Sequence, residues 1–309
     1  MTRYKIILNP VSGRGRGEQA IPQVESLLHS HGLNFEITRT QAPGHAIQLA
    51  EQAAAGGWDV VVAVGGDGTA NEVINGLAHA RLSGSGQAAL GIISVGNGND
   101  FAFGAGIPLG LEQACQVLAA NQRRWLDVGF VQGGDYPQGR FFGNGVGIGF
   151  DAVVGFEALK LKHLHGFPSY IVAALKTIFL YFQAPTVRVE FDGQSLTQPA
   201  LMVSIMNGQR MGGGFMMAPQ SQPDDGLFDL CIAAQVSRAG IFALIPRFMQ
   251  GTQAGHPAIH TARAARVTVS AVQGSLPAHA DGETLCTAGE RLALEIRPRL
   301  VEVVVPGGA

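Results

Sequence analysis

Short apolar segments alternate with amphipathic ones along the first 128 residues, and this alternation restricts the possible folds more than any other feature of the chain. The apolar segments, which are typical of buried strands, lie at 4–8, 35–40, 59–66 and 89–96. The segments with helical spacing lie at 18–31, 44–57, 69–80 and 111–122. Strands that alternate with helices predict a parallel sheet with helices on both faces. We therefore expect a doubly wound α/β domain over 1–128.

From residue 129 onward the chain changes to strand-like segments with few helices between them. These segments lie at 140–150, 186–193, 200–208, 227–234, 265–272, 291–298 and 300–306. Helical insertions are expected at roughly 154–182 and 238–250, and a hairpin is expected around Asp192-Gly193. The pattern is typical of an antiparallel β-sandwich. We expect a second, β-rich domain over 129–309, with the last strand able to pack back on the first domain.

The composition excludes several classes of protein. Of the 309 residues 46% are hydrophobic, which suffices for two cores, and only 14% are charged, which excludes intrinsic disorder. A net charge of −2 excludes a generally basic nucleic-acid binder. The three cysteines form no Cys-x-x-Cys, so neither a zinc knuckle nor a disulfide framework is expected. The apolar stretch 170–182 is interrupted by Lys176 and is too short to span a bilayer, and the first residues do not resemble a signal peptide.

The motif GGDGTAN, at 65–71, follows the most apolar predicted strand and opens a predicted helix. Ligands bind at the carboxyl ends of strands in a parallel sheet. Glycines there let the backbone approach a phosphate, and the helix N-terminus offers unpaired N–H groups. Asp67 can hold a hydrated Mg²⁺ at this position. The alternative interpretation is a tight strand-to-helix turn in which Thr69 is the N-cap.

A second loop of the same design, GNGNDFA at 96–102, follows the next predicted strand. It also combines glycines, amides and a carboxylate, Asp100. The two loops can therefore face each other across one crevice. Asn97 or Asn99 can instead supply left-handed turn residues. A third carboxylate, Asp127, lies at the expected domain junction.

Taken together, the motifs of the chain resemble those of the diacylglycerol kinase catalytic-domain family, which includes bacterial soluble lipid kinases and sphingosine kinases. The motifs that carry the resemblance are NPVSG (9–13), GGDGT (65–69), GNGNDFA (96–102), WLDVG (125–129), PDDGLFDL (223–230) and ADGE (280–283). GGDGT alone is shared with NAD kinases and phosphofructokinases, so the specific signal is the whole set in this order. The resemblance extends from about residue 3 to residue 306.

The resemblance implies an NAD-kinase-like nucleotide domain, a β-rich lipid-binding domain, and phosphoryl transfer from ATP to a lipid hydroxyl. It implies contacts with the nucleotide or its Mg²⁺ at Asn9, Thr40, Gly65, Gly66, Asp67, Gly68, Thr69, Ala70, Asn71, Asn97, Asp100 and Asp127. Asp67, Asp100 and Asp127 would organise the catalytic Mg²⁺ and its waters. The family usually has threonine where this chain has Asn97. Asparagine can still donate a hydrogen bond to phosphate, but its shape differs.

The resemblance also implies a general base at Asp281 or Glu283, acting together with Asp67. In an extended segment residues two apart point to the same face, so both carboxylates can reach the substrate. A second, structural Mg²⁺ or Ca²⁺ is implied at Gln222, Asp225 and Leu227. Read locally, ADGE and PDDG are plain turns, although three aspartates near 224–229 are also a plausible set of ligands for a hard cation.

The segment 159–185 combines basic and aromatic residues. It can dock on an anionic membrane surface or gate an acyl-chain pocket, or it can be an ordinary helix packed on the sandwich. The segment 241–251 allows the same interpretations.

We interpret the chain as an ATP- and Mg²⁺-dependent lipid kinase that acts on a diacylglycerol-like lipid, phosphatidylglycerol or a sphingoid base. Its expected partners are ATP and a lipid at the membrane surface, without nucleic acid, and a homodimer is left open. The expected location is the cytoplasm, with peripheral association at the inner face of the membrane. Two alternatives remain: an NAD kinase, which shares GGDGT and the two-domain plan, and a non-catalytic module that binds a lipid or a nucleotide.

Overall fold

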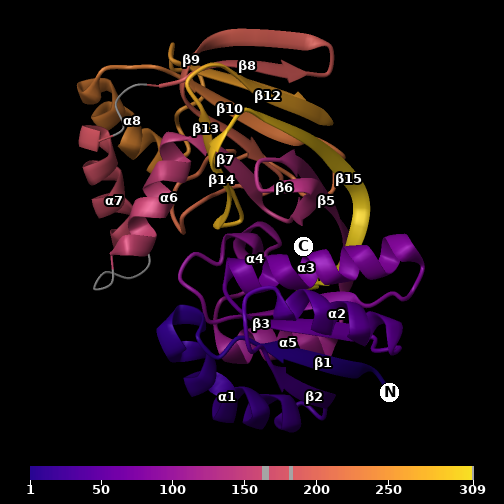
Figure 1. Cartoon of the computed structure of the whole chain (residues 1–309). Helices are drawn as coiled ribbons and strands as arrows, with labels where there is room; N and C mark the ends of the chain where they lie inside the picture. Colours follow the sequence, from indigo (N-terminus) through magenta and orange to yellow (C-terminus); the bar gives the residue numbers. More distant parts are fainter. Residues whose placement is uncertain (162–166, 181–183, 308–309) are drawn as a thin grey trace. The chain divides into compact units, whose positions relative to one another are not determined.

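The computed structural model describes residues 1–161, 167–180 and 184–307. The chain divides into two compact units, Met1–Val128 with Pro298–Ala309, and Gly129–Arg297 (Figure 1). The boundaries fall inside two strands, β5 (Arg123–Gly133) and β15 (Arg291–Val304). Within the described ranges no helix is both long enough and apolar enough to cross a bilayer.

The first unit is built on a parallel sheet with the strand order β15-β4-β3-β1-β2. Its other strands are β1 (Arg3–Leu8), β2 (Asn34–Arg39), β3 (Val60–Gly65) and β4 (Ala89–Ser94). Its helices are α1 (Ser12–Ser30), α2 (His45–Ala55), α3 (Asp67–Ser83), α4 (Asp100–Gly104) and α5 (Leu111–Ala120). The short, valine-rich strand β3 is buried on both faces, as expected for the centre of such a sheet.

Helices cover both faces of this sheet, which confirms the predicted fold class. On one face α1 and α5 pack through Val24, Leu28 and Leu118 against alternate residues of β1 and β3. On the other face lie α2 and α3, which pack against each other (Figure 1). Gly76 of α3 allows this close approach, because a Cβ there would lie 2.3 Å from the carbonyl oxygen of Ile47.

Within the first unit, the helices differ from the predicted ones at two places, both next to the loops. The helix predicted from residue 18 is α1, which begins at Ser12 and contains non-helical, positive-φ residues at 13–15. The second loop was predicted without a helix, but it contains the single-turn helix α4. Phe101 and Ala102 of α4 are buried, so apolar packing forms a helix that is too short to show a periodicity in the sequence.

The second unit is a β-sandwich, as predicted, with helices outside it. Its further strands are β6 (Tyr136–Phe142), β7 (Gly145–Gly149), β8 (Thr186–Phe191), β9 (Gln194–Met206), β10 (Phe228–Ala234), β11 (Ile259–Ala264), β12 (Arg266–Gln273), β13 (Leu276–Ala280) and β14 (Glu283–Gly289). Its helices are α6 (Phe150–Lys160), α7 (Phe167–Leu180) and α8 (Arg238–Gln250). The strand β9 joins the two sheets, because its first half pairs with β8 and its second half pairs with β7 and β10.

Alternation along β9 separates the sandwich core from the helical layer. Val203 and Ile205 point into the core between the sheets. Met202 and Met206 point outward and pack with residues of α6, α7 and α8. The sheet that contains β7, β9 and β10 is therefore buried on both faces, which explains why every residue of 200–206 is buried and why apolar residues do not alternate with polar ones there.

Two predictions for the second unit need correction, and a third, the helical insertion, is confirmed. The strand predicted over 140–150 is two strands, β6 and β7, separated at Gly143 and Asn144. The two strands predicted at 291–298 and 300–306 are one, β15, which bends at Arg299 with φ of 49°. The insertion predicted over 154–182 contains two helices, α6 and α7. The parts of it at 162–166 and 181–182 lie outside the described residues.

Candidate active site

Two glycine loops lie side by side at the carboxyl ends of the neighbouring parallel strands β3 and β4. Their backbones touch, because a Cβ on Gly96 would lie 2.3 Å from Cα of Gly66. The carbonyl oxygen of Gly65 accepts hydrogen bonds from the N–H groups of Val95 and Gly96, at 2.8 and 3.2 Å. This contact of the two loops requires glycine and places the start of α3 against the loop that leads into α4.

The carboxylates of Asp67 and Asp100 lie beside the same glycine in the second loop. A Cβ on Gly98 would be 2.7 Å from Oδ2 of Asp67 and 3.3 Å from Oδ2 of Asp100. Oδ1 of Asp67 accepts the backbone N–H of Phe101 at 3.1 Å, which fixes the orientation of its carboxylate. Asp100 is only 6% exposed. Two carboxylates around a cradle that a methyl group would fill suit Mg²⁺, which typically takes one or two carboxylates and completes its shell with phosphate oxygens and water.

The loop after β1 contacts the end of β3 and the first turn of α3 through backbone and side-chain hydrogen bonds. Nδ2 of Asn9 donates to the hydroxyl of Thr69 at 3.0 Å, and the N–H of Asn9 donates to the carbonyl of Val64 at 3.0 Å. The N–H of Val11 donates to Oδ1 of Asn9 at 3.2 Å. Thr69 lies inside the first turn of α3 rather than before it, so it is not the N-cap. Its hydroxyl instead connects α3 to Asn9.

Arg16 is a site residue that sequence reasoning missed. Its Nη2 donates to the carbonyl of Gly96 at 2.9 Å and to Oδ1 of Asn97 at 2.6 Å, and its Nε donates to the carbonyl of Gly13 at 3.2 Å. Arg16 therefore joins the loop after β1 to the loop after β4. The two arginines among the glycines of 13–17 were the available signal. The side chain of Asn97, which departs from the family pattern, is turned toward this guanidinium.

The remaining predicted nucleotide positions surround these loops. Gly68, Ala70 and Asn71 lie in the first turns of α3, and Asn71 is buried and accepts hydrogen bonds from Nδ2 of Asn75. Thr40 follows β2, and its N–H donates to the carbonyl of Leu8 at 2.8 Å. Asp127 stands apart, since its Oδ1 accepts the N–H of Arg299 at 2.7 Å and so holds the bend in β15. The structure thus brings Asp67 and Asp100 together and engages Asp127 in a separate contact.

The two candidate bases occupy very different surroundings in the second unit. Oδ2 of Asp281 accepts the N–H of Gly143 at 2.7 Å, and its Oδ1 accepts those of Asn144 and Gly145 at 3.0 and 2.9 Å. Asp281 is 7% exposed, and this set of bonds divides β6 from β7. Glu283 begins β14 and is only partly buried. The carboxylate of Asp281 is therefore occupied by backbone N–H groups, whereas the side chain of Glu283 is more accessible to solvent.

A second polar group in this unit was not predicted. Gly147, Ser204 and His279 are register neighbours on adjacent strands, and Asp151 of α6 lies over them. A Cβ on Gly147 would lie 2.3 Å from Oδ2 of Asp151 and 2.6 Å from Nε2 of His279. Burial raises the pKa of the Asp151 carboxyl to about 7, and burial lowers the pKa of the His279 imidazole to about 4. In the sequence, the glycines of 145–149 indicate that something packs closely against this strand, but they do not identify Asp151 and His279 as the side chains that do so.

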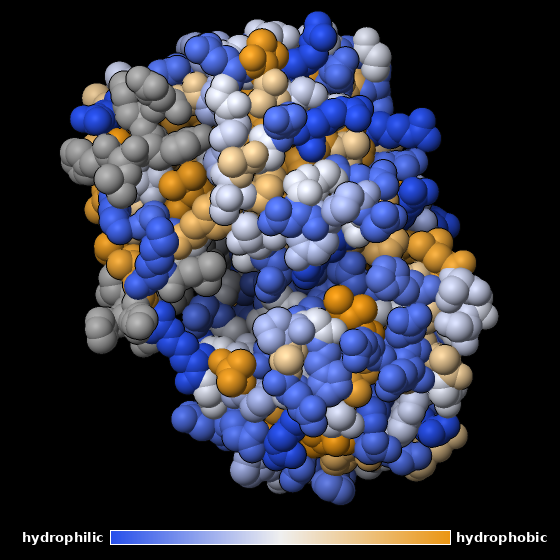
Figure 2. All heavy atoms as spheres, viewed as in Figure 1, coloured by the Kyte–Doolittle hydropathy of each residue, from blue (hydrophilic) through white to orange (hydrophobic). Residues whose placement is uncertain are grey.

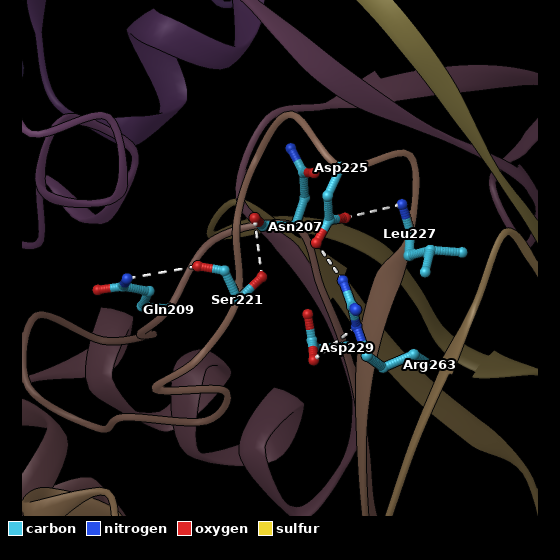
Figure 3. A network of polar contacts seen from close by, with 7 residues as sticks. All are labelled: Asn207, Gln209, Ser221, Asp225, Leu227, Asp229 and Arg263. Carbon is cyan, nitrogen blue, oxygen red and sulfur yellow. Dashed lines mark hydrogen bonds and ion pairs between the residues drawn. The ribbon is translucent and has the colours of Figure 1, made fainter. Parts of the chain in front are cut away.

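The predicted structural metal ligands lie on the loop before β10, and Figure 3 shows two of them, Asp225 and Leu227. Oδ1 of Asp225 accepts the N–H of Leu227 at 3.1 Å, and its Oδ2 pairs with the guanidinium of Arg263. Across the described part of the chain, no group of three or more His, Cys, Asp or Glu side chains is arranged to hold a metal. An arginine already pairs with the carboxylate that the prediction assigned to a metal, whereas the carbonyl oxygens of Gln222 and Leu227 remain predicted ligands.

Exposed apolar side chains of the second unit gather on its outer helices. Val172 and Leu175 of α7 and Phe242 and Met249 of α8 are each about two-fifths exposed, and the two helices contact each other. Figure 2 shows apolar residues at the left edge of the view, where Figure 1 labels α7. Arg247 lies in the last turn of α8. Apolar and basic groups on one helical layer are compatible with contact to a lipid surface.

Comparison with known proteins gives consistent results over both units. Residues 3–131 match the family model described as the diacylglycerol kinase catalytic domain, and residues 144–305 match the YegS C-terminal NAD kinase beta sandwich-like domain. The chain is 32% identical to a diacylglycerol kinase of Bacillus subtilis over 92% of this chain and 90% of that protein. It is 30% identical to a Pseudomonas aeruginosa protein named "Probable lipid kinase YegS-like", over 100% and 97% of the two chains.

Solved structures support the same fold. A crystal structure of a diacylglycerol kinase from Bacillus anthracis has a TM-score of 0.75 at 20% identity, covering 99% of this chain and 97% of that chain. An NAD kinase from Archaeoglobus fulgidus, in complex with ATP, has a TM-score of 0.52 at 12% identity, covering 98% and 93% of the two chains. At these identities the likeness establishes the fold alone.

Proposed function

The chain belongs to the diacylglycerol kinase catalytic-domain family, whose members are phosphotransferases with an alcohol acceptor, and we propose that it transfers the γ-phosphoryl group of ATP to the hydroxyl of a lipid in a Mg²⁺-dependent reaction. The observation that carries the proposal is the pair of carboxylates, Asp67 and Asp100, around Gly98 at the ends of β3 and β4. We also propose that the first unit binds the nucleotide and that the second binds the lipid.

On the nucleotide side the chain supplies positioning and charge. The glycine loops and the N-terminus of α3 would receive the phosphates through backbone N–H groups. Asn9, Thr69 and Arg16 would hold the three loops against one another through hydrogen bonds. Asp67 and Asp100 would hold Mg²⁺, which neutralises charge on the phosphates when it is bound. Phosphoryl transfer depends mainly on such positioning and neutralisation, which is why so few ionisable side chains suffice.

On the acceptor side Glu283 is our candidate for the general base. A lipid hydroxyl is a weak nucleophile, so a carboxylate that accepts its proton assists the transfer. Asp281 already accepts three backbone N–H groups, which leaves it poorly placed to take a proton from a substrate. We therefore assign to Asp281 the positioning of the turn that carries Glu283.

The lipid would be a diacylglycerol-like lipid, phosphatidylglycerol or a sphingoid base, presented at a membrane surface. The exposed apolar residues of α7 and α8 support this side of the proposal, because a protein that takes a substrate from a bilayer needs an apolar surface to approach it. An NAD kinase is the second candidate, on the likeness of fold to the Archaeoglobus enzyme. The names of the relatives that share about 30% identity with the chain favour the lipid kinase.

A single incubation tests the proposal without assuming the lipid. Purified protein is mixed with a total lipid extract, γ-labelled ATP and Mg²⁺, and the organic phase is analysed by thin-layer chromatography and mass spectrometry. We expect at least one lipid to gain a phosphate, with no labelling in EDTA or with Asp67→Asn. Hydrolysis of ATP without any labelled lipid would reject the proposal.

A further inference from the structure

The side chain of Arg263 bridges a strand and a loop through two carboxylates. Register places Arg263 of β11 directly opposite Asp229 of β10, and its Nε lies 3.4 Å from Oδ1 of Asp229. Its Nη2 pairs with Oδ2 of Asp225, which lies on the loop before β10. Figure 3 shows the guanidinium between the two carboxylates.

These two carboxylates need a cation because they are close together and withdrawn from water. The side chains of Asp225 and Asp229 are only 23% and 17% exposed. Oδ2 of Asp229 is buried and has no hydrogen-bond partner among the described residues. A positive charge between the two carboxylates offsets their mutual repulsion.

We propose that the guanidinium of Arg263 is the built-in cation of this loop and takes the structural role that the sequence assigned to a divalent metal at Gln222, Asp225 and Leu227. Arginine suits the role because it stays charged at all relevant pH values and its planar fork can pair with two carboxylates at once. The orientation of Asp225 agrees with this, since one oxygen faces Arg263 and the other accepts the N–H of Leu227. The inference does not depend on whether the protein is a kinase.

The bridge supports more than its own loop. Oγ of Ser221 donates to the carbonyl of Asn207 at 3.0 Å, which connects the loop to the end of β9. Asn207 in turn donates through its N–H to the carbonyl of Asn144 and through Nδ2 to the carbonyl of Gly143, both at 2.8 Å. Gly143 and Asn144 are the residues whose N–H groups hold Asp281. Arg263 is therefore linked to the turn that carries Glu283 through the backbone of the loop between Asp225 and Ser221 and through these hydrogen bonds.

A double-mutant cycle in EDTA tests the proposal on the full chain without nucleotide. The proteins are wild type, Arg263→Gln, Asp225→Asn and the double variant, with Arg266→Gln as control, because Arg266 makes an exposed pair with Glu295 on the next strand. Thermal or urea unfolding is followed with EDTA and with excess Mg²⁺. We expect wild type to keep its Tm in EDTA and each single variant to lose several degrees. The loss in the double variant should be clearly smaller than the sum of the single losses.

Two results would overturn the proposal. One is a wild-type Tm that falls in EDTA and returns with Mg²⁺, because a metal would then be the cation of the loop. The same response must be seen in Asp67→Asn, so that a metal at the glycine loops is not its source. The other is additive losses from Arg263→Gln and Asp225→Asn in EDTA. If Arg263→Gln does not fold, Arg263→Lys replaces it in the cycle. Lysine retains the charge and loses the fork, so a partial loss of Tm that is again non-additive with Asp225→Asn supports the proposal.

Discussion

Oδ2 of Asp67 and Oδ2 of Asp100 lie beside the same point, the position that a Cβ on Gly98 would occupy, although the two aspartates belong to different loops. The parallel pairing of β3 and β4 brings the two loops to one edge of the sheet. The contact between Gly66 and Gly96 then brings them close enough for the carboxylates to converge. This arrangement is what a Mg²⁺–phosphate group requires, and it can be disturbed with a single methyl group.

Gly98→Ala should impair turnover while leaving the fold intact. The backbone of Gly98 is not in the left-handed region, so alanine is conformationally acceptable there. Its methyl would collide with the carboxylate of Asp67, which can move aside but then no longer faces Asp100. We expect a loss of about 100-fold in kcat/KM for ATP, typical of a misplaced catalytic group. Circular dichroism and Tm should match wild type.

Gly155→Ala is the matched control, since a Cβ there meets no atom within 4 Å. Equal turnover in both variants would contradict the role assigned to Gly98.

Glu283→Gln should slow the transfer step without weakening nucleotide binding. A general base typically contributes about 10²–10⁴-fold in rate, so kcat should fall by that order while the Kd for ATP stays unchanged. Glu290→Gln, on an exposed glutamate of the following turn, is the control and should behave as wild type. Full turnover in Glu283→Gln would exclude it as the base, and the search would return to Asp67, Asp100 and Asp127.

Asp281→Asn should act first on stability. A carboxamide has only one acceptor oxygen for the three N–H groups of 143–145. Its NH₂ group would face at least one N–H, so a donor would meet a donor. Hydrogen bonds to charged groups are worth about 1.5–3 kcal/mol each, so a loss of at least that size in the free energy of unfolding is expected. Urea unfolding measures it. A variant with the stability of wild type and a kcat lowered as far as in Glu283→Gln would instead mark Asp281 as the base.

The stability of the second unit should depend on pH through Asp151. The folded-state pKa of its carboxyl is about 7, raised by burial from an ordinary value of 3.8. Between these values the folded protein holds a proton that the unfolded chain has released, so raising the pH lowers stability across this window and has no further effect above it. His279 has the opposite effect, because its pKa is lowered to about 4 and stability is lost as the pH falls below about 6.5.

Asp151→Asn removes the first of these contributions and retains the second. The Tm of the variant, minus that of wild type, should therefore rise between pH 5 and pH 7 and then level off. Glu190→Gln, on an exposed residue of β8, should show no such trend. A constant difference in Tm across the range would show that Asp151 is ionised in the folded protein.

The sequence predicted the first unit well because its signals are local. An apolar strand followed by a glycine turn and a helix reports its own structure, and 59–71 was placed correctly for that reason. The side chains that join the loops could not be found in this way. Arg16 reaches Gly96 and Asn97 across 80 residues or more, and no periodicity encodes such a contact.

The second unit was predicted less accurately, because single polar residues decide its strand breaks. The apparent strand 140–150 is divided by the carboxylate of Asp281, which is more than 135 residues away in the chain. The bend in β15 depends likewise on Asp127. A turn motif such as PDDG reveals acidic residues but not their counter-ion, so Arg263 became apparent only in the structure.

The central claim is that the acceptor of the phosphoryl group is a lipid hydroxyl, and a comparison of acceptors tests it most directly. Purified protein receives γ-labelled ATP and Mg²⁺ with either NAD or vesicles that contain diacylglycerol, phosphatidylglycerol or a sphingoid base, and initial rates of transfer are measured. We predict transfer to at least one lipid, no transfer to NAD, and loss of the lipid signal in Glu283→Gln but not in Glu290→Gln. Transfer to NAD with unlabelled lipids would contradict the account.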